Sequence, residues 1–297
     1  MLCMSPRWRA AARLTAVSFV CALASPVALA DSAPGGKHAH ARKYVALGDS
    51  FAAAPFQDPV DPSSGGCERS LNNYPSQVAD SLGLERDSGF VDATCSGATS
   101  YGITEDEGPQ GVAGGHSAML DAVDADADLV TVTIGAANDG LAQTVFSDCD
   151  LGGGDCEQKV RAKPQLGDMS GFFPELKESL ADALRQIRQA APKATVLVVS
   201  YLRAGIAWCP AWGSYNAQDA MYIDGLEARL NNALKEAAVA SRSTFVDVNP
   251  VSSDHGVCAD DPWVAGGGAS LGGDIALHPS PAGQTAAARA VLAALKR

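Results

Sequence analysis

The amino-acid sequence predicts an α/β protein of three layers, in which helices cover both faces of a central parallel sheet of about five strands. Short apolar runs alternate with longer segments of helical periodicity, and two of the runs are closed by glycine. The chain has 297 residues, which is enough for one large domain of this class after a short leader.

The first half of the domain is predicted to alternate between strand and helix. Residues 44–47 are a short apolar run that Gly48 closes. Residues 74–83 have proline in the first turn and glycine at the end, which is typical of a helix. The run at 89–95 is the second predicted strand, and 117–127 is predicted to be a helix with its apolar residues on one side.

The second half continues this alternation. Residues 128–135 are the clearest strand, because they are rich in β-branched residues and end in glycine. Apolar residues at helical spacing predict a helix at 172–191, which a proline ends, and a buried strand at 194–201 follows. A long amphipathic helix at 215–240 leads to the fifth strand at 243–248.

Two further segments complete the predicted order. Residues 147–154 are expected to be a polar loop, and 281–295 an alanine-rich closing helix. Parallel strands joined by helical crossovers place helices on both faces of a sheet. The order therefore predicts a flavodoxin-like three-layer α/β/α sandwich.

Residues 1–30 have the pattern of a secretory signal peptide. Three arginines precede an apolar stretch at about residues 14–24, and a small-x-small cleavage site ends at Ala30. No run approaches the roughly 18 apolar residues of a membrane span. We expect residues 31–42 to be a flexible leader and 43–297 to be the mature domain, secreted from the cell.

The charge balance limits the partners of the protein. Its net charge is −12 at pH 7, so it repels nucleic acids and anionic membranes. We therefore expect no nucleic-acid partner. From the lack of a membrane-length apolar run we expect no stable membrane insertion, and separately we expect a monomer.

Eight cysteines are present, and two of them lie in the signal segment. An even number in an exported chain implies disulfides. No CxxC motif or Cys/His cluster has the spacing of metal ligands, so we predict no metal. The remaining six are Cys67, Cys95, Cys149, Cys156, Cys209 and Cys258.

The first predicted strand ends in Gly48-Asp49-Ser50. Ligands bind beyond the carboxyl ends of the strands in open α/β sheets, so Ser50 is presented to a cleft. Gly48 permits a tight turn, and the Ser50 N–H is free to donate. On these residues alone, Ser50 is equally well explained as the cap of a following helix.

A serine nucleophile requires a general base. His278 lies in a loop that Pro279 and Pro281 restrict, just before the last predicted helix. His255 is the rival base, and we favour a structural or substrate-pocket role for it. His116 lies in a glycine-rich loop and is expected to be solvated.

Four short blocks occur along the chain in a characteristic order. They are Gly48-Asp49-Ser50, the loop glycine Gly97, Asn138-Asp139 after the third strand, and His278-Pro279. With the segments at 67–75 and 95–99, they resemble the SGNH (GDSL-type) hydrolases, in particular their secreted bacterial lipase/esterase branch. The resemblance spans nearly the whole mature chain.

The resemblance implies a role for each block. Ser50 would be the nucleophile, and His278 the general base and then the acid toward the leaving alcohol. The backbone N–H groups of Ser50 and Gly97 and the side-chain amide of Asn138 would form the oxyanion hole. No cofactor is implied. The implied disulfides follow the sequence order: Cys67–Cys95, Cys149–Cys156 and Cys209–Cys258.

The third and fourth blocks depart from the family pattern. Gly135 stands one residue further from Asn138 than usual, so either Ala136 takes the glycine position or the turn has an extra residue. The usual aspartate three residues before His278 is replaced by Ile275, and Asp274 stands four before it. We favour the Ile275 carbonyl over Asp274 as the group that orients His278, which would make a Ser–His dyad.

The sequence therefore predicts a secreted serine hydrolase that cleaves small-molecule or lipid carboxylic esters, as a lipase or esterase, through an acyl-enzyme on Ser50. A catalytically impaired binding protein on the same scaffold is one alternative, which the two altered blocks support. An esterase specialised for acetylated polysaccharide or phospholipid is the other. No long lid helix is predicted, which favours an open cleft.

Overall fold

The computed structural model describes residues 42–108, 115–150, 153–267 and 275–296, which belong to one compact unit. The predicted signal peptide and nearly all of the predicted leader lie outside these residues, so the domain boundaries stay predictions. Within the described part of the chain, no helix combines the length and apolar character needed to cross a membrane.

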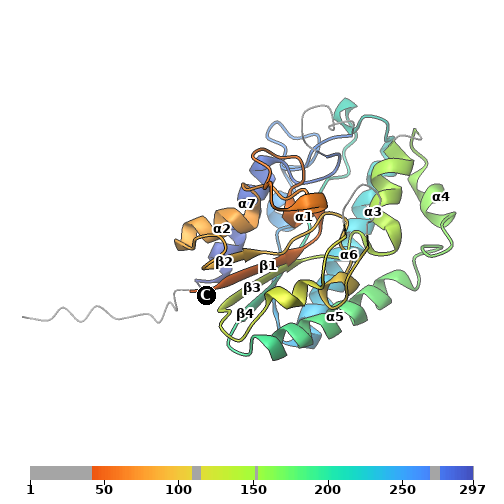
Figure 1. Ribbon diagram of the computed structural model, residues 1–297. Coiled ribbons are helices and arrows are strands. Elements are labelled where there is room, and N and C mark those ends of the chain that lie inside the picture. Colours follow the sequence, from red (N-terminus) through yellow and green to blue (C-terminus); the bar gives the residue numbers. More distant parts are fainter. Residues whose placement is uncertain (1–41, 109–114, 151–152, 268–274, 297) are drawn as a thin grey trace, which may run out of the picture. The chain divides into compact units, whose positions relative to one another are not determined.

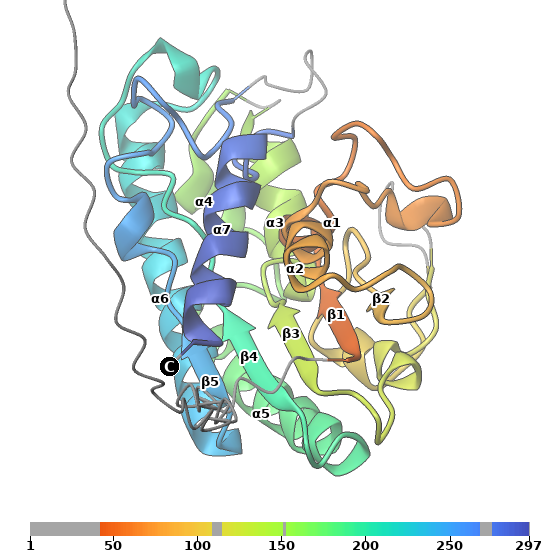
Figure 2. The same cartoon turned by 90° about the vertical axis from the view of Figure 1, so that its left-hand side faces the viewer.

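Five parallel strands form one sheet in the order β2-β1-β3-β4-β5. They are β1 (Tyr44–Gly48), β2 (Phe90–Asp92), β3 (Leu129–Thr133), β4 (Thr195–Val199) and β5 (Thr244–Val246). Figure 2 shows the neighbouring strands with their arrowheads toward the same edge. This is the flavodoxin-like order, and the predicted fold class is confirmed. All residues of β1 and β3 are buried, as expected for a sheet covered on both faces.

Four longer helices form the two outer layers. α2 (Tyr74–Leu82) packs against α7 (Pro281–Ala294) over one face of the sheet, and α5 (Phe172–Ala190) packs against α6 (Ala217–Ser241) over the other (Figure 1). The shorter helices are α1 (Ser50–Ala53), α3 (Leu141–Gln143), α4 (Cys156–Arg161), a π-helix at Thr144–Cys149, and 3₁₀ helices at Gly65–Cys67, Tyr101–Ile103, Met119–Ala122, Asn138–Gly140, Pro210–Trp212 and Pro250–Ser252.

The ends of the longer helices follow from local sequence. The Asn73 side chain caps α2, and Gly83 ends it in a left-handed conformation. Asn216 and Asp219 form a reciprocal capping box at the start of α6. The Ser280 side chain accepts the Gly283 N–H at the start of α7, where Pro281 needs no hydrogen bond.

Two predictions of local structure were wrong. Residues 117–127 form only a 3₁₀ helix at Met119–Ala122, because the Asp124 carboxylate accepts the Asp126 N–H and forms an ion pair with Lys43. The predicted loop at 147–154 instead begins inside the π-helix, where the buried Cys149 continues the apolar side of the preceding turns.

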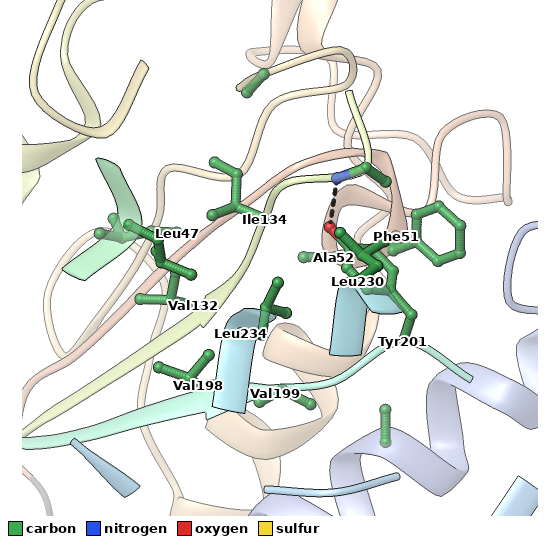
Figure 3. Packing of buried hydrophobic residues seen from close by; sticks show 14 of the residues in the cluster. Leu47, Phe51, Ala52, Val132, Ile134, Val198, Val199, Tyr201, Leu230 and Leu234 are labelled. Carbon is green, nitrogen blue, oxygen red and sulfur yellow. Dashed lines mark hydrogen bonds between the residues drawn. The ribbon is translucent and has the colours of Figure 1, made fainter. Parts of the chain in front are cut away.

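Side chains from the sheet and α6 meet in the core. Leu47, Val132 and Val198 come from the strands, and Leu230 and Leu234 come from α6 (Figure 3). All five are at most 5% exposed, so they supply the burial that holds this layer in place. The carboxyl ends of the strands are thereby fixed relative to one another.

Candidate active site

Ser50 occupies a strand-to-helix turn at the carboxyl end of β1. A Cβ on Gly48 would lie 2.6 Å from the Thr133 carbonyl oxygen, so only glycine fits between the two strands. The Asp49 side chain accepts the Phe51 N–H at 3.0 Å and caps α1, of which Ser50 is the first residue. The turn therefore projects Ser50 beyond the edge of the sheet.

The structure brings His278 to Ser50 from the other end of the chain. The Nε2 atom of His278 lies 2.7 Å from Ser50 Oγ, and its Nδ1 atom lies 3.0 Å from the Ala276 carbonyl oxygen. A carbonyl only accepts hydrogen bonds, so Nδ1 carries the ring hydrogen and Nε2 accepts from the serine hydroxyl. This is the arrangement that proton transfer from Ser50 requires.

The carbonyl that orients His278 is not the predicted one. The Ile275 carbonyl accepts the backbone N–H of His278 at 3.1 Å, and the Ala276 carbonyl accepts from the ring. Leu277, between them, adopts a left-handed conformation with φ 59°, which makes the turn tight enough for this contact. The predicted residue was therefore wrong by one position. Asp274, the predicted alternative, lies outside the described residues.

Aromatic rings enclose His278 and change its titration. Phe51 stacks on the imidazole with centroids 4.6 Å apart, and Phe146 meets it edge-on at 4.8 Å. His278 is only 4% exposed, and burial lowers its pKa from 6.5 to about 4, although the Ala276 hydrogen bond acts in the opposite direction. The imidazole is therefore neutral at pH 7 and can accept a proton.

A buried hydrogen-bond chain joins the ends of three strands behind Ser50. The Tyr201 hydroxyl donates to Asp49 Oδ2 at 2.5 Å and accepts the Ala136 N–H at 2.9 Å, the contact drawn in Figure 3. Burial raises the pKa of Asp49 to about 7. No sequence motif assigned this role to Tyr201; the only signal in the sequence was a tyrosine, which carries a hydroxyl, at the end of a predicted buried strand.

The third block forms a turn that holds Asn138 rigidly. Gly135 keeps a glycine conformation with φ 129°, and the Asn138 N–H donates to its carbonyl at 3.2 Å, so the extra residue lies inside this turn. The Asn138 side chain is 2% exposed. Its Oδ1 accepts the Ser100 N–H at 2.9 Å, and its Nδ2 donates to Ser100 Oγ at 2.8 Å. That contact uses one of the two amide hydrogens and leaves the other for a further acceptor.

A cavity of about 280 Å³ opens over the Ser50–His278 pair. We call it the reaction cavity; Ser50, Pro55, Phe56, Glu68, Ser96, Gly97, Ala137, Gly140, Ala142, Gln143, Phe146, Ser147, Ile275 and His278 line it. An apolar hollow of about 50 Å³ adjoins it, and Ala142 and Phe146 line both spaces. Phe51 and Leu277, which directly follow Ser50 and precede His278, also line the hollow.

The other described histidines have different surroundings. The His255 ring stacks on Trp263 at 3.8 Å, which is consistent with a structural role. The expectation that His116 is solvated was wrong, because its ring lies 3.2 Å from Glu107 and its side chain is 11% exposed. Glu107 also accepts from Thr99, so this pair anchors the loop that follows Gly97.

Three disulfides stabilise the loops around these elements. They join Cys67 to Cys95, Cys149 to Cys156 and Cys209 to Cys258, the order that the resemblance implies. No group of three or more His, Cys, Asp or Glu side chains in the described part of the chain is placed to hold a metal ion.

Comparisons with known proteins identify the family of this chain. The GDSL-like Lipase/Acylhydrolase family matches residues 46–286. Lipase 2 of Streptomyces coelicolor is 32% identical over 231 residues, which cover 72% of this chain and 72% of that protein. A lipase of Streptomyces rimosus is 28% identical over 256 residues, 86% of this chain and 87% of its own. The chain therefore belongs to the GDSL-like lipase/acylhydrolase family, and its class is carboxylic ester hydrolase.

Two solved structures are similar over almost their whole length. The extracellular lipase of Streptomyces rimosus has a TM-score of 0.69 and 26% identity, covering 85% of this chain and 99% of its own. Phospholipase A1 of Streptomyces albidoflavus has a TM-score of 0.67 and 25% identity, covering 86% and 99%. The resemblance to the SGNH hydrolases is confirmed.

Proposed function

We propose that this protein is a secreted serine hydrolase that cleaves carboxylic esters through an acyl-enzyme on Ser50. The observation that carries the proposal is the contact between Ser50 Oγ and the neutral, buried His278, whose other ring nitrogen donates to the Ala276 carbonyl. A serine hydroxyl needs a neighbouring base to become a nucleophile, and this one has it.

Each residue of the pair acts twice in the proposed reaction. Ser50 Oγ attacks the ester carbonyl while its proton passes to His278 Nε2, and the C=O double bond opens to an oxyanion. When the oxyanion collapses, the bond to the alcohol breaks and His278 gives that proton to the alcohol oxygen. Water then attacks the acyl carbon and gives a proton to His278 Nε2; the bond between the acyl carbon and Ser50 Oγ breaks, the carboxylic acid leaves, and His278 returns the proton to Ser50 Oγ. The Ala276 carbonyl stabilises the transient imidazolium, as a dyad requires.

The oxyanion would be held by donors from three elements. The backbone N–H groups of Ser50 and Gly97 and the second amide hydrogen of Asn138 are the candidates. Ser50 and Gly97 both line the reaction cavity, and Ser100 holds the Asn138 amide in one orientation. Donors held in this way stabilise the developing charge without reorganisation.

The apolar hollow is the proposed binding site for the acyl chain of the ester. It adjoins the reaction cavity, and its lining includes Phe51 and Leu277 beside the two reacting side chains. Apolar surface favours an alkyl chain over the alcohol portion of an ester. Because the hollow holds only about 50 Å³, we expect short acyl chains to be preferred.

Secretion is supported by three independent features. Residues 1–30 have the signal-peptide pattern, the domain has three disulfides, and one similar structure is an extracellular lipase. Disulfides of this kind persist in oxidising compartments.

A fluorophosphonate probe tests the nucleophile directly. We expect stoichiometric labelling of the folded protein and no labelling of Ser50→Ala. Ser88→Ala is the matched control, because it removes the hydroxyl of an exposed serine that does not line the reaction cavity; this variant should be labelled like the wild type. If the folded wild-type protein were not labelled, the proposal of a serine hydrolase would be rejected, and an exported binding protein would be the better interpretation.

A further inference from the structure

Among the described residues that line the reaction cavity, Glu68 has the single formally charged side chain. His278, which also lines it, is neutral at pH 7 because burial lowers its pKa to about 4. Within the described part of the chain, the Glu68 carboxylate has no ion pair and no hydrogen-bond donor. This differs from Asp61 and Glu107, which are both paired.

The backbone around Glu68 is held firmly. Glu68 ends the 3₁₀ helix Gly65–Cys67 in a left-handed conformation, with φ 54° and ψ 33°, and its N–H donates to the Gly65 carbonyl. The neighbouring Cys67 is bonded to Cys95, and the Cys67 carbonyl accepts the Ser96 N–H at 3.2 Å. Glu68 therefore shares one braced wall with the loop that presents Gly97.

This wall differs chemically from the hollow on the other side of Phe146. The hollow is lined mostly by apolar side chains, and neither Glu68 nor Gly97 takes part in it. Its one carboxyl group among the described residues is Glu227, which is mostly neutral at pH 7 because burial raises its pKa to about 8. An ionised carboxylate is costly beside a buried alkyl chain but favourable beside a cation or a hydroxyl donor. If the acyl chain enters the hollow, the alcohol portion of the ester remains on the Glu68 side.

We propose that Glu68 selects the alcohol portion of the substrate and favours an ester whose alcohol carries a positive charge. The inference rests on the proposed function, because it assumes hydrolysis at Ser50. The attraction between the Glu68 carboxylate and a cationic group about 7 Å away depends on the effective dielectric, which lies between that of a protein surface and that of water. At this separation the attraction should raise kcat/KM by about threefold to tenfold. An anionic alcohol portion is disfavoured by a similar factor.

A matched pair of substrates isolates this charge. One is the choline ester of butyric acid, and the other is the ester in which a tert-butyl group replaces the trimethylammonium group at nearly the same size. We expect kcat/KM of the wild type to be about threefold to tenfold higher for the choline ester. Glu68→Gln should bring the ratio of the two kcat/KM values close to one.

Glu85→Gln is the control, because Glu85 is exposed, is absent from the lining of the cavity and makes the same change in net charge. It should leave the ratio unchanged, which separates a local contact from general steering by the acidic protein. Raising the ionic strength with the wild type should lower kcat/KM for the choline ester and not for its isostere.

The outcomes separate the two proposals. Equal ratios for wild type and Glu68→Gln, with both esters cleaved, would reject the role of Glu68 and leave the hydrolase intact. A loss of preference in both glutamine variants would reject it as well. If the wild type cleaved neither ester and failed to react with the fluorophosphonate, the proposed function itself would fail. Should Glu68→Gln not fold, the salt dependence decides: no difference between the two esters overturns the inference.

Discussion

His278 and His255 are two loop histidines with the same local contact and different surroundings. In each, the ring Nδ1 lies close to a backbone carbonyl oxygen, at 3.0 Å from Ala276 and 2.9 Å from Asp261 respectively. The Nε2 atom of His278 meets Ser50 Oγ, whereas the His255 ring lies flat on Trp263. A carbonyl-oriented imidazole is therefore not enough to make a base.

Burial separates the two rings further. His278 is 4% exposed and enclosed by Phe51 and Phe146, whereas the His255 side chain is 30% exposed. Trp263 donates its N–H to the His255 carbonyl, so that loop is held by stacking and backbone contacts. Its interactions stabilise a loop, whereas those of His278 set a protonation state.

The largest expected effect comes from removing each ring in turn. His278→Ala should lower kcat/KM for p-nitrophenyl butyrate by about 10³-fold or more, because Ser50 loses its base. His255→Ala should lower it by less than about tenfold, mainly through loop stability. Steady-state kinetics on folded variants measure both; the reverse pattern would make His255 the base and overturn our assignment.

The pH dependence sharpens the comparison. Protonated His278 cannot accept from Ser50, so kcat/KM for a neutral ester should fall about tenfold per pH unit below about pH 4, where the buried ring titrates. At pH 5, where an ordinary histidine is mostly charged, most of the activity should remain.

Phe146→Ala is the matched test of the cause, because it removes one of the rings against His278. Water should then solvate the imidazole, so the pH below which kcat/KM falls should rise toward 6.5. If kcat/KM of the wild type already fell below about pH 6.5, burial would not control the titration of this histidine.

The same burial has a consequence for stability. The pKa of His278 is about 4 in the folded state and about 6.5 in the unfolded chain, so the unfolded state binds the proton first as the pH falls. The contribution of His278 to the free energy of unfolding is constant above about pH 6.5. As the pH falls from 6.5 to 4, this contribution decreases progressively, so the folded state becomes less stable. Asp49, with a folded pKa of about 7, acts in the opposite direction, because its folded form binds the proton first.

The smallest expected effect concerns Asp274, the predicted alternative for the group that orients His278. Asp274→Ala should lower kcat by less than about tenfold, because the Ala276 carbonyl already orients His278. Asp274→Asn is the companion variant, which removes the charge and nearly keeps the shape. A loss of about 10³-fold in both variants would instead assign the orienting role to Asp274 and make the site a triad.

The sequence predicted most of the architecture because local patterns carry that information. β-branched runs and capped helices placed all five strands and four longer helices near their observed bounds. It failed at 117–127, where apolar spacing predicted a helix and the aspartates, through local side-chain contacts, favoured a short turn. It also failed for His116, whose partner Glu107 became evident only from an antiparallel contact between two loop residues.

By itself, the sequence determined the fold class, the cysteine inventory and the residue types from which an ester hydrolase is built. Strand periodicity and the Gly-Asp-Ser turn are properties of a few neighbouring residues, so they can be interpreted without coordinates. Only the tertiary structure decided that the Ala276 carbonyl orients His278, that the Tyr201 hydroxyl donates to Asp49, and that Glu68 is among the residues that line the reaction cavity. Those facts depend on a single left-handed residue and on contacts between distant loops, which residue order alone does not encode.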